Sequence, residues 1–373
     1  MLEQFVEVLA EGDERGNGML LRFRFPSGLT VHGLPTPNEY GGEWDLGPTW
    51  NFLVQADRPF LVDAGRWGTG AMLVEAMGQV GQSAADLDYV LLSHGHEDHD
   101  GGLAEVAART GAAVKAHQVY GLLVHRYPDL APQDYKRDFP AKCWHCFMPE
   151  SYYRPNCLPY HREILASEVQ PIGDGRVQLA PGVETIHLPG HSPDALAILL
   201  GEEVLLVGDN LLPEITPWPT NLRMHQTVAG VLGRLYPEAG MLYGLSRYLR
   251  SLKEMAALAA ARPGLAVLPA HRLFHHGRLH SIDLPERVAT MLGHHVERCA
   301  DILRILQKGP LDAETIAQRH FAPEKLKGPG RLMAKNEVVC HCELLEEAGC
   351  VARIGRTFAA TGAGDIQAFI AAI

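Results

Sequence analysis

The sequence has no long apolar run and no excess of basic residues, and each absence excludes a class of protein. No apolar stretch approaches the ~18 residues that a membrane-spanning helix requires. The formal net charge of −11 over 373 residues lacks the basic footprint of a dedicated nucleic-acid binder. Residues 1–16 have no cationic segment followed by an apolar one, so we expect no signal peptide and a cytoplasmic protein.

The sequence also lacks the cysteine pattern of a secreted, disulfide-rich domain. The seven cysteines are an odd number, and two groups of them are closely spaced, which suits reduced thiols or metal ligands better. With 46% hydrophobic and 21% charged residues, the chain can bury a core. Its length suits two domains.

Most of the chain alternates short apolar runs with helical patterns, which is typical of an α/β protein. Apolar runs bounded by glycine, proline or polar residues predict strands over residues 19–25, 28–34, 50–65 (a hairpin), 88–93, 112–117, 183–209 (three strands) and 265–271. Apolar residues at helical spacing predict helices over residues 68–81, 102–111 and 239–264.

Two regions depart from this alternation. Residues 120–170 are rich in prolines and aromatic residues, contain three cysteines and are expected to form an insertion. From about residue 281 the pattern is helical, with one long helix or a bent pair over 285–309, a helix over 312–320, and a helix followed by a two-stranded ribbon over 335–362. This order resembles a winged helix. We therefore expect a catalytic domain over 1–280 and a small, mostly helical winged-helix-like domain over 281–373.

The segment LLSHGHEDHDGG, residues 91–102, concentrates three histidines and three acidic residues at the end of a predicted strand. Alternate residues of an extended segment point the same way, so His94 and His96 can converge on one metal ion. Beyond the bend, Asp98 and His99 can reach a second ion. Gly101 and Gly102 are expected to give the turn its backbone freedom. Imidazoles together with carboxylates suit zinc or iron better than magnesium.

Three further residues of metal-binding type follow at the ends of later strands. They are His191 in LPGHSPDA, Asp209 in LLVGDN and His271 in VLPAHR. Each alone would be an ordinary loop residue. Together with the segment at 91–102, they form a set of metal-binding residue types at strand ends.

With these motifs, the chain resembles the metallo-β-lactamase superfamily of hydrolases over residues 50–271. The resemblance implies an αββα sandwich, two sheets with helices outside, and a dinuclear centre at one edge. It implies His94, His96 and His191 as ligands of one metal, Asp98, His99 and His271 as ligands of the other, and Asp209 as the bridging carboxylate. Asp63 matches an early aspartate of the family that braces the metal-binding loop. The tail further resembles the branch of the superfamily with a C-terminal winged-helix-like domain.

Two divalent cations, zinc first with iron or manganese as alternatives, would lower the pKa of a shared water and supply hydroxide near neutral pH. The expected function is hydrolysis of a carbonyl compound, namely a small-molecule thioester, ester or lactone. Asp98 and Asp209 are the expected catalytic residues, and Asp98 is also a candidate for passing a proton to the leaving group.

A second metal-type pattern lies in the expected insertion. Cys143, Cys146, Cys157 and His161 have the spacing of a small zinc knuckle, which would hold a structural metal ion. The alternative is that these cysteines are small apolar residues of a loop that covers the active site. Near the end of the chain, Cys340, Cys342 and Cys350 are expected to pack in a core.

Two other activities remain open on the same ligand set. The branch with the winged-helix-like tail resembles an RNA-cleaving enzyme as well as thioesterase-like ones, so a phosphodiesterase or ribonuclease is one alternative. The 11 basic and 12 acidic residues of 281–373 do not favour nucleic acid. The tail is expected to pack on the hydrolase domain, close the pocket or form a homodimer. A mononuclear-iron enzyme resembling the sulfur dioxygenases is the other alternative.

Overall fold

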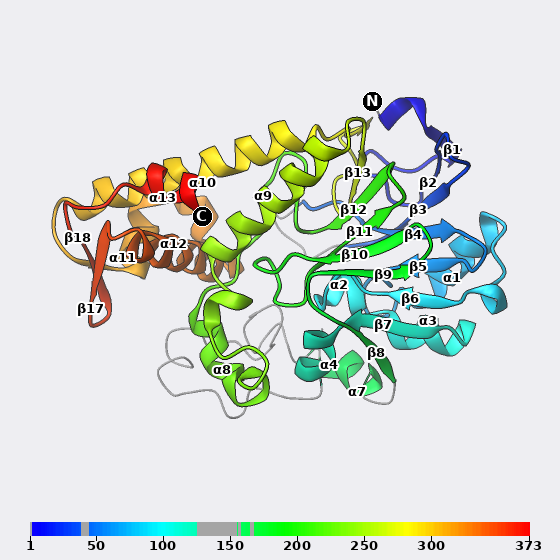
Figure 1. Cartoon of the computed structure of the whole chain (residues 1–373), viewed down its shortest axis with the longest axis horizontal. Coiled ribbons are helices and arrows are strands. Elements are labelled where there is room, and N and C mark those ends of the chain that lie inside the picture. Colours follow the sequence, from blue (N-terminus) through cyan, green and yellow to red (C-terminus); the bar gives the residue numbers. More distant parts are fainter. Residues whose placement is uncertain (1, 39–44, 125–154, 156–157, 165–167) are drawn as a thin grey trace.

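The computed structural model describes residues 2–38, 45–124, 155, 158–164 and 168–373. Two sheets pack face to face, and helices cover their outer faces, so the predicted αββα sandwich is confirmed (Figure 1). Along the long axis of the molecule, α1 and α3 lie at one end and the C-terminal elements at the other.

The first sheet has eight strands in sequence order, antiparallel from β1 to β5 and parallel from β5 to β8. The strands are β1 (Val6–Ala10), β2 (Leu20–Arg24), β3 (Thr30–Thr36), β4 (Thr49–Gln55), β5 (Phe60–Val62), β6 (Tyr89–Leu91), β7 (Ala113–His117) and β8 (Val169–Ile172). Helices α1 (Gly70–Gln79) and α3 (Leu103–Thr110) bury apolar side chains against its outer face.

The second sheet has the order β13-β12-β11-β10-β9 and is antiparallel except between β12 and β13. Its strands are β9 (Arg176–Ala180), β10 (Val183–His187), β11 (Leu196–Leu200), β12 (Val204–Gly208) and β13 (Ala266–Pro269). All five residues of β11 are buried because the strand has a covered layer on each face. Ile198 joins the core between the sheets, while Ala197 and Leu199 join the core beneath α9 (Leu245–Ala261).

The remaining helices of the sandwich lie near the expected insertion and before α9. They are α2 (Glu97–Asp100), α4 (Gln118–Val124), α7 (Leu158–Ile164) and α8 (Arg223–Leu232). The insertion predicted over 120–170 is therefore too wide at both ends, since α4 is packed in the core and β8 extends the first sheet. The helix predicted from residue 239 begins at Leu245, because Gly244 adopts a φ of 97° that interrupts it.

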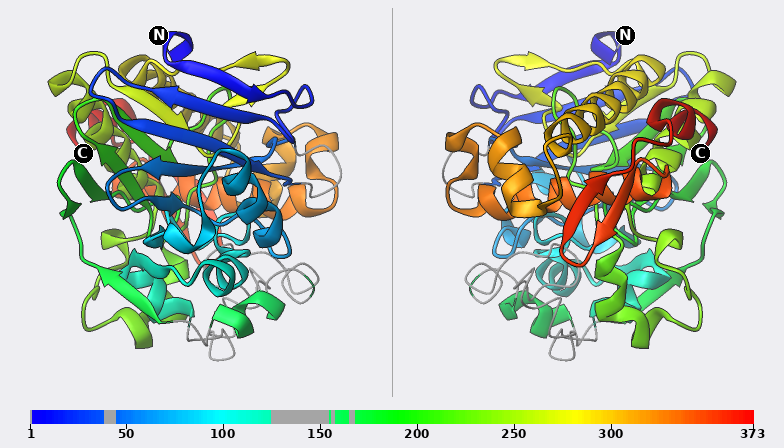
Figure 2. Two further views of the ribbon diagram at one scale, coloured as in Figure 1. Left: turned by 90° about the vertical axis from the view of Figure 1, so that its right-hand side faces the viewer. Right: turned by 90° about the vertical axis from the view of Figure 1, so that its left-hand side faces the viewer.

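The C-terminal elements follow the predicted order of helices and ribbon. They are α10 (Leu284–Leu306), α11 (Ala313–His320), α12 (Pro329–Glu347), the strands β16 (Leu311–Asp312), β17 (Val351–Ile354) and β18 (Thr357–Ala360), and α13 (Ile366–Ala372). Of the two readings of 285–309, the single long helix is correct. It starts where the Asp283 carboxylate accepts a hydrogen bond from the Glu286 amide. Figure 2 shows the ribbon of β17 and β18 on the outer side of these helices.

The tail shares its apolar core with the sandwich. One continuous cluster of buried side chains joins β11, β12 and α9 to α10, α11, α12 and the ribbon. Cys340, Cys342 and Cys350 lie buried within it, as predicted. No helix in the part of the chain that the structure describes is long and apolar enough to cross a bilayer.

Shortening a side chain in the shared cluster should destabilise the protein. Met291 on α10 is 0% exposed, so Met291→Ala should lower the free energy of unfolding by about 2–5 kcal/mol. Met72 on α1 is 49% exposed, and Met72→Ala should change the free energy of unfolding by less than ~0.5 kcal/mol. Denaturant unfolding measures both, and equal effects of the two substitutions would contradict the shared core.

Candidate metal centre

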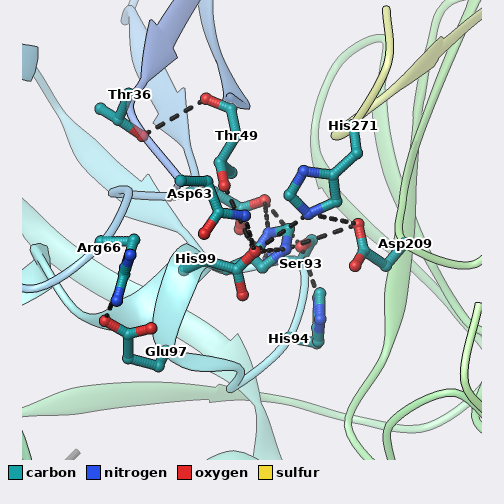
Figure 3. A network of polar contacts seen from close by, with 12 residues as sticks. Thr36, Thr49, Asp63, Arg66, Ser93, His94, Glu97, His99, Asp209 and His271 are labelled. Carbon is teal, nitrogen blue, oxygen red and sulfur yellow. Dashed lines mark hydrogen bonds and ion pairs between the residues drawn. The ribbon is translucent and has the colours of Figure 1, made fainter. Parts of the chain in front are cut away.

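The predicted ligand residues lie at the ends of strands from both sheets. His94 and His96 follow β6 of the first sheet, and α2 then presents Asp98 and His99. Asp209 directly follows β12, and His271 follows β13, both of the second sheet. Figure 3 shows the side chains of Asp209 and His271 pointing toward those of His94 and His99. The structure thus brings together residues from widely separated parts of the sequence.

The seven side chains form two clusters, and within each cluster the ligand atoms lie within 4.8 Å of one another. The first cluster is His94, His96, His191 and Asp209, and the second is Asp98, His99 and His271. Asp209 reaches into both. One of its oxygens, Oδ2, lies 3.7 Å from His191 Nε2, and the other, Oδ1, lies 3.5 Å from His99 Nε2. The two oxygens of Asp209 therefore face different clusters.

The imidazole rings are oriented by hydrogen bonds on their far sides. His191 Nδ1 donates to the Trp218 carbonyl at 2.9 Å, and His271 Nδ1 donates to the Pro48 carbonyl at 3.3 Å. His99 Nδ1 donates to the Asp63 carboxylate at 2.8 Å. Because a carbonyl or carboxylate can only accept, Nδ1 of each of these rings carries a proton, and Nε2 is the atom that faces the centre.

Five buried atoms that face the centre make no hydrogen bond within the described residues. They are His94 Nε2, His99 Nε2, His191 Nε2, His271 Nε2 and Asp209 Oδ1. A buried polar atom left without a partner costs about 1–3 kcal/mol. Divalent cations would satisfy all five atoms at once, so the residues present fit a dinuclear metal centre.

The electrostatics differ between the two clusters. Burial, followed by the neighbouring His191, lowers the pKa of His96 to about 3, so this imidazole is neutral and ready to bind a metal ion. At His271 burial also opposes the charge, but the Asp209 and Asp98 carboxylates outweigh it and raise the pKa to about 9. Protons therefore compete with a cation in the second cluster, and metal affinity there falls as the pH falls.

Asp63 is hydrogen-bonded to the segment that carries His94 and His99, and its bracing role stays a prediction. It follows β5 with a φ of 65°, and its carboxylate accepts from the Ser93 amide at 2.7 Å and from the Ser93 hydroxyl at 2.8 Å.

The glycines of the loop serve a different purpose from the one expected. Gly102 has an ordinary φ of −86°, but a Cβ there would lie 2.2 Å from the Ala64 carbonyl oxygen. A glycine is required at position 102 because the backbone passes too close to Ala64 for a side chain, and not because the backbone needs an unusual φ.

Two polar residues near the centre were not predicted. Asn38 Nδ2 donates to Asp98 Oδ2 at 2.8 Å, and Thr49 Oγ1 lies 3.4 Å from the same oxygen. His271 Nε2 lies 3.0 Å from that oxygen as well. Asn38 and Thr49 precede Asp98 by 60 and 49 residues, and no local motif marks them.

The zinc-knuckle prediction is not addressed by the structure. Cys143, Cys146 and Cys157 lie outside the described residues. His161 lies on α7, and its side chain is likewise outside the description.

Helix α12 of the tail holds the loop that orients His191. Asn336 accepts from Asn221 Nδ2 at 2.6 Å and donates to the Pro219 carbonyl at 3.0 Å. The Glu343 carboxylate accepts from the Leu222 amide at 2.8 Å. These contacts begin one residue after Trp218, whose carbonyl accepts from His191 Nδ1. The tail therefore supports the centre without supplying any of the predicted ligands.

Comparison with known proteins settles the family. Residues 44–271, more than half of the chain, match the sequence model described as Metallo-beta-lactamase superfamily. The chain belongs to this superfamily. It is a hydrolase of the metallo-β-lactamase fold, and its seven clustered histidines and aspartates are of the kind that holds divalent metal ions.

Curated relatives of the superfamily include thioesterases. An atrochrysone carboxyl ACP thioesterase of Aspergillus fumigatus is 27% identical over 207 residues, which cover 51% of this chain and 38% of that protein. The lactamase-like protein ptaB of Pestalotiopsis fici is 27% identical over 210 residues, which cover 53% of this chain and 52% of that protein. The matches thus span about half or less of the length of these relatives.

Solved structures of the superfamily share the fold. A metallo-beta-lactamase family protein from Thermus thermophilus has a TM-score of 0.62 at 23% identity, over 88% of this chain and 98% of that one. A beta-lactamase domain protein from Burkholderia ambifaria has a TM-score of 0.63 at 20% identity, over 97% of this chain and 98% of that one. The second similarity covers nearly the whole chain, including most of the C-terminal helices.

Removing the charge of Asp209 should make the centre lose its metal ions. We expect Asp209→Asn to lose bound metal and at least ~100-fold in kcat/KM, since the bridging oxygens face both clusters. Asp100→Asn is the matched control, because Asp100 is equally buried on α2 and accepts from Tyr120 outside both clusters. Metal analysis of purified protein and a hydrolase assay measure the effect. Wild-type metal content in Asp209→Asn would contradict the bridging position.

Glu343 should make the protein less stable as the pH rises. Burial raises its pKa from the ordinary 4.5 to about 7, so the unfolded chain releases this proton at lower pH than the folded protein does. The free energy of unfolding therefore falls between these two values and levels off above them. Glu343→Gln should stabilise the protein by on the order of 1–3 kcal/mol at about pH 8 and change little near pH 4.5.

Glu346→Gln is the control for this substitution. Glu346 is more exposed on the same helix and paired with Arg353 at 2.7 Å, so its removal should give no gain that depends on pH. Denaturant unfolding at both pH values measures the difference. An equal gain for Glu343→Gln at the two pH values would contradict the burial of a protonated carboxyl.

Proposed function

We propose that the protein is a metal-dependent thioester hydrolase acting on a small acyl substrate. The observation that carries this proposal is the set of buried, unpartnered Nε2 atoms that face Asp209 at one edge of the sandwich. The names of the curated relatives, several of them acyl-carrier-protein thioesterases, support a thioester over an oxygen ester or a lactone.

The seven side chains His94, His96, Asp98, His99, His191, Asp209 and His271 would hold two divalent cations. When bound, these cations lower the pKa of a shared water and polarise the carbonyl under attack. Five imidazoles among seven ligands favour zinc over magnesium or calcium. The protein's own contribution is to orient the rings of His99, His191 and His271, which it does through the acceptors of their Nδ1–H groups.

Asp98 is the candidate for moving a proton. Asn38 and Thr49 lie against its Oδ2, and the Asn38 amide fixes the orientation of the carboxylate by donating to that oxygen. A carboxylate held in this way at the edge of the centre can take the proton released by the attacking water and then pass it to the departing thiolate sulfur. Asp63 has no such access, since Ser93 and His99 occupy its oxygens.

The tail is proposed to act as a winged-helix-like support and not as a reader of nucleic acid. Its 11 basic and 12 acidic residues give a net charge of −1 over 281–373. Several phosphate contacts would require a comparable number of clustered lysines and arginines. Helix α12 instead directs Asn336 and Glu343 toward the loop that carries Trp218.

A panel of substrates tests the proposal. Zinc-loaded protein should hydrolyse acyl thioesters with a kcat/KM at least ~10-fold above matched oxygen esters and lactones, a difference of about 1.4 kcal/mol in transition-state binding. Asp209→Asn should abolish the reaction, and Asp100→Asn should keep it. Preferential cleavage of a phosphodiester or of RNA would replace the proposal by the nuclease alternative. Oxygen consumption with a persulfide by iron-loaded protein would replace it by the dioxygenase alternative.

A further inference from the structure

A second group of side chains that could hold a metal ion lies outside the seven-residue centre, between two helices of the tail. His294 and His295 extend from α10, and Glu337 extends from α12. One ligand atom from each lies within 4.8 Å of the other two. Figure 1 shows the two helices side by side at the C-terminal end of the molecule. No residue of this group is among the seven ligands proposed above.

The hydrogen bonds determine which nitrogen of His295 carries the proton. His341 Nδ1 lies 2.7 Å from the backbone carbonyl of Glu337 and must donate to it. Burial lowers the pKa of His341 to about 3, so its ring is neutral and its Nε2 is an acceptor. His295 Nδ1, 3.0 Å from that Nε2, must therefore donate. The proton of His295 is on Nδ1, and Nε2 has a bare lone pair.

This lone pair is buried and unused. The His295 side chain is 0% exposed, and among the described residues its Nε2 has no hydrogen-bond partner. The Nε2 of His294 is buried without a partner in the same part of the chain. Burial lowers the pKa of both histidines, so both rings are neutral, which is the form that binds a metal ion.

The charges at the group set its affinity and selectivity. Arg298 Nη1 lies 2.6 Å from Glu337 Oε1, which leaves the second oxygen of the carboxylate for a cation. Two imidazoles and one carboxylate oxygen suit zinc or a neighbouring transition metal, and not calcium or magnesium. The guanidinium of Arg298 repels a cation, so binding here should be weaker than at the centre, where two carboxylates contribute.

A third cluster, His117, His187 and Asp174, has similar residues but the opposite arrangement. The Val119 amide donates to His117 Nδ1, which places the ring proton on Nε2, the atom that lies 3.1 Å from Asp174 Oδ1. The rings of His117 and His187 stack at 3.6 Å with only 18° between their planes. Two stacked rings cannot both direct an in-plane lone pair at one ion, so this cluster is not a metal site.

We propose that His294, His295 and Glu337 form a transition-metal site that ties α10 to α12 and is separate from the hydrolytic centre. The site does not depend on the proposed thioesterase activity. It would cross-link the two longest helices of the tail, and α12 is the helix that supports the loop next to His191.

Metal stoichiometry of the full-length chain tests the site. The protein is stripped with a chelator, given zinc, dialysed briefly and analysed for metal. His294→Gln and Glu337→Gln should each bind one equivalent less than wild type and keep the hydrolase activity. His320→Gln, on α11, is the matched control and should bind as much as wild type. In wild type, this equivalent should also be the first to leave on longer dialysis.

Unchanged zinc content in both His294→Gln and Glu337→Gln would overturn the proposal. A measurement on wild-type protein covers the case in which a variant fails to fold. Crystals soaked in zinc should give an anomalous difference peak about 2.1 Å from His295 Nε2. No peak there, with zinc present at the hydrolytic centre, would also overturn it. Loss of zinc at the centre with zinc retained between α10 and α12 would count against the proposed function alone.

Discussion

The arrangement of this protein depends on one electrostatic requirement, the burial of several imidazoles and carboxylates close together at the ends of strands. Asp209 Oδ1 lies 3.4 Å from His271 Nε2 and 3.5 Å from His99 Nε2, and it accepts no hydrogen bond within the described residues. Such a group is stable only if the protein fixes each lone pair on a common point. The sandwich meets this need because strands of both sheets end at one edge.

Four of the seven expected ligands could be predicted because they lie close to one another in the sequence. His94, His96, Asp98 and His99 lie within six residues, and a ligand that directly follows an apolar strand needs no long-range information to be noticed. Most strands and helices of the core were predictable from their apolar periodicity, whereas the αββα sandwich followed from the resemblance to the superfamily. The single helix of 284–306 could not be told from a bent pair, because that choice depends on packing against α9 and α12.

The supporting residues could not be predicted, because they act through contacts between distant segments. Asn38 meets Asp98 across 60 residues, and Asn336 meets Asn221 across 115. A lone asparagine has no periodicity or spacing that distinguishes such a role from a solvated loop. The buried lone pair of His295 is a similar case, since it follows from a chain of two hydrogen bonds through His341. Each of these features depends on tertiary structure alone.

The contact between α12 and the loop at 218–222 has a consequence for how variation in this protein is interpreted. Cys340 and Asn336 both reach the Pro219 carbonyl, one residue from the carbonyl that orients His191. In a functional screen, substitutions on this face of the tail would cluster with those of the hydrolytic residues, although the two groups lie far apart in sequence. A map of the positions at which substitutions abolish function would therefore include the residues of α12 that support the loop as well as the expected metal ligands.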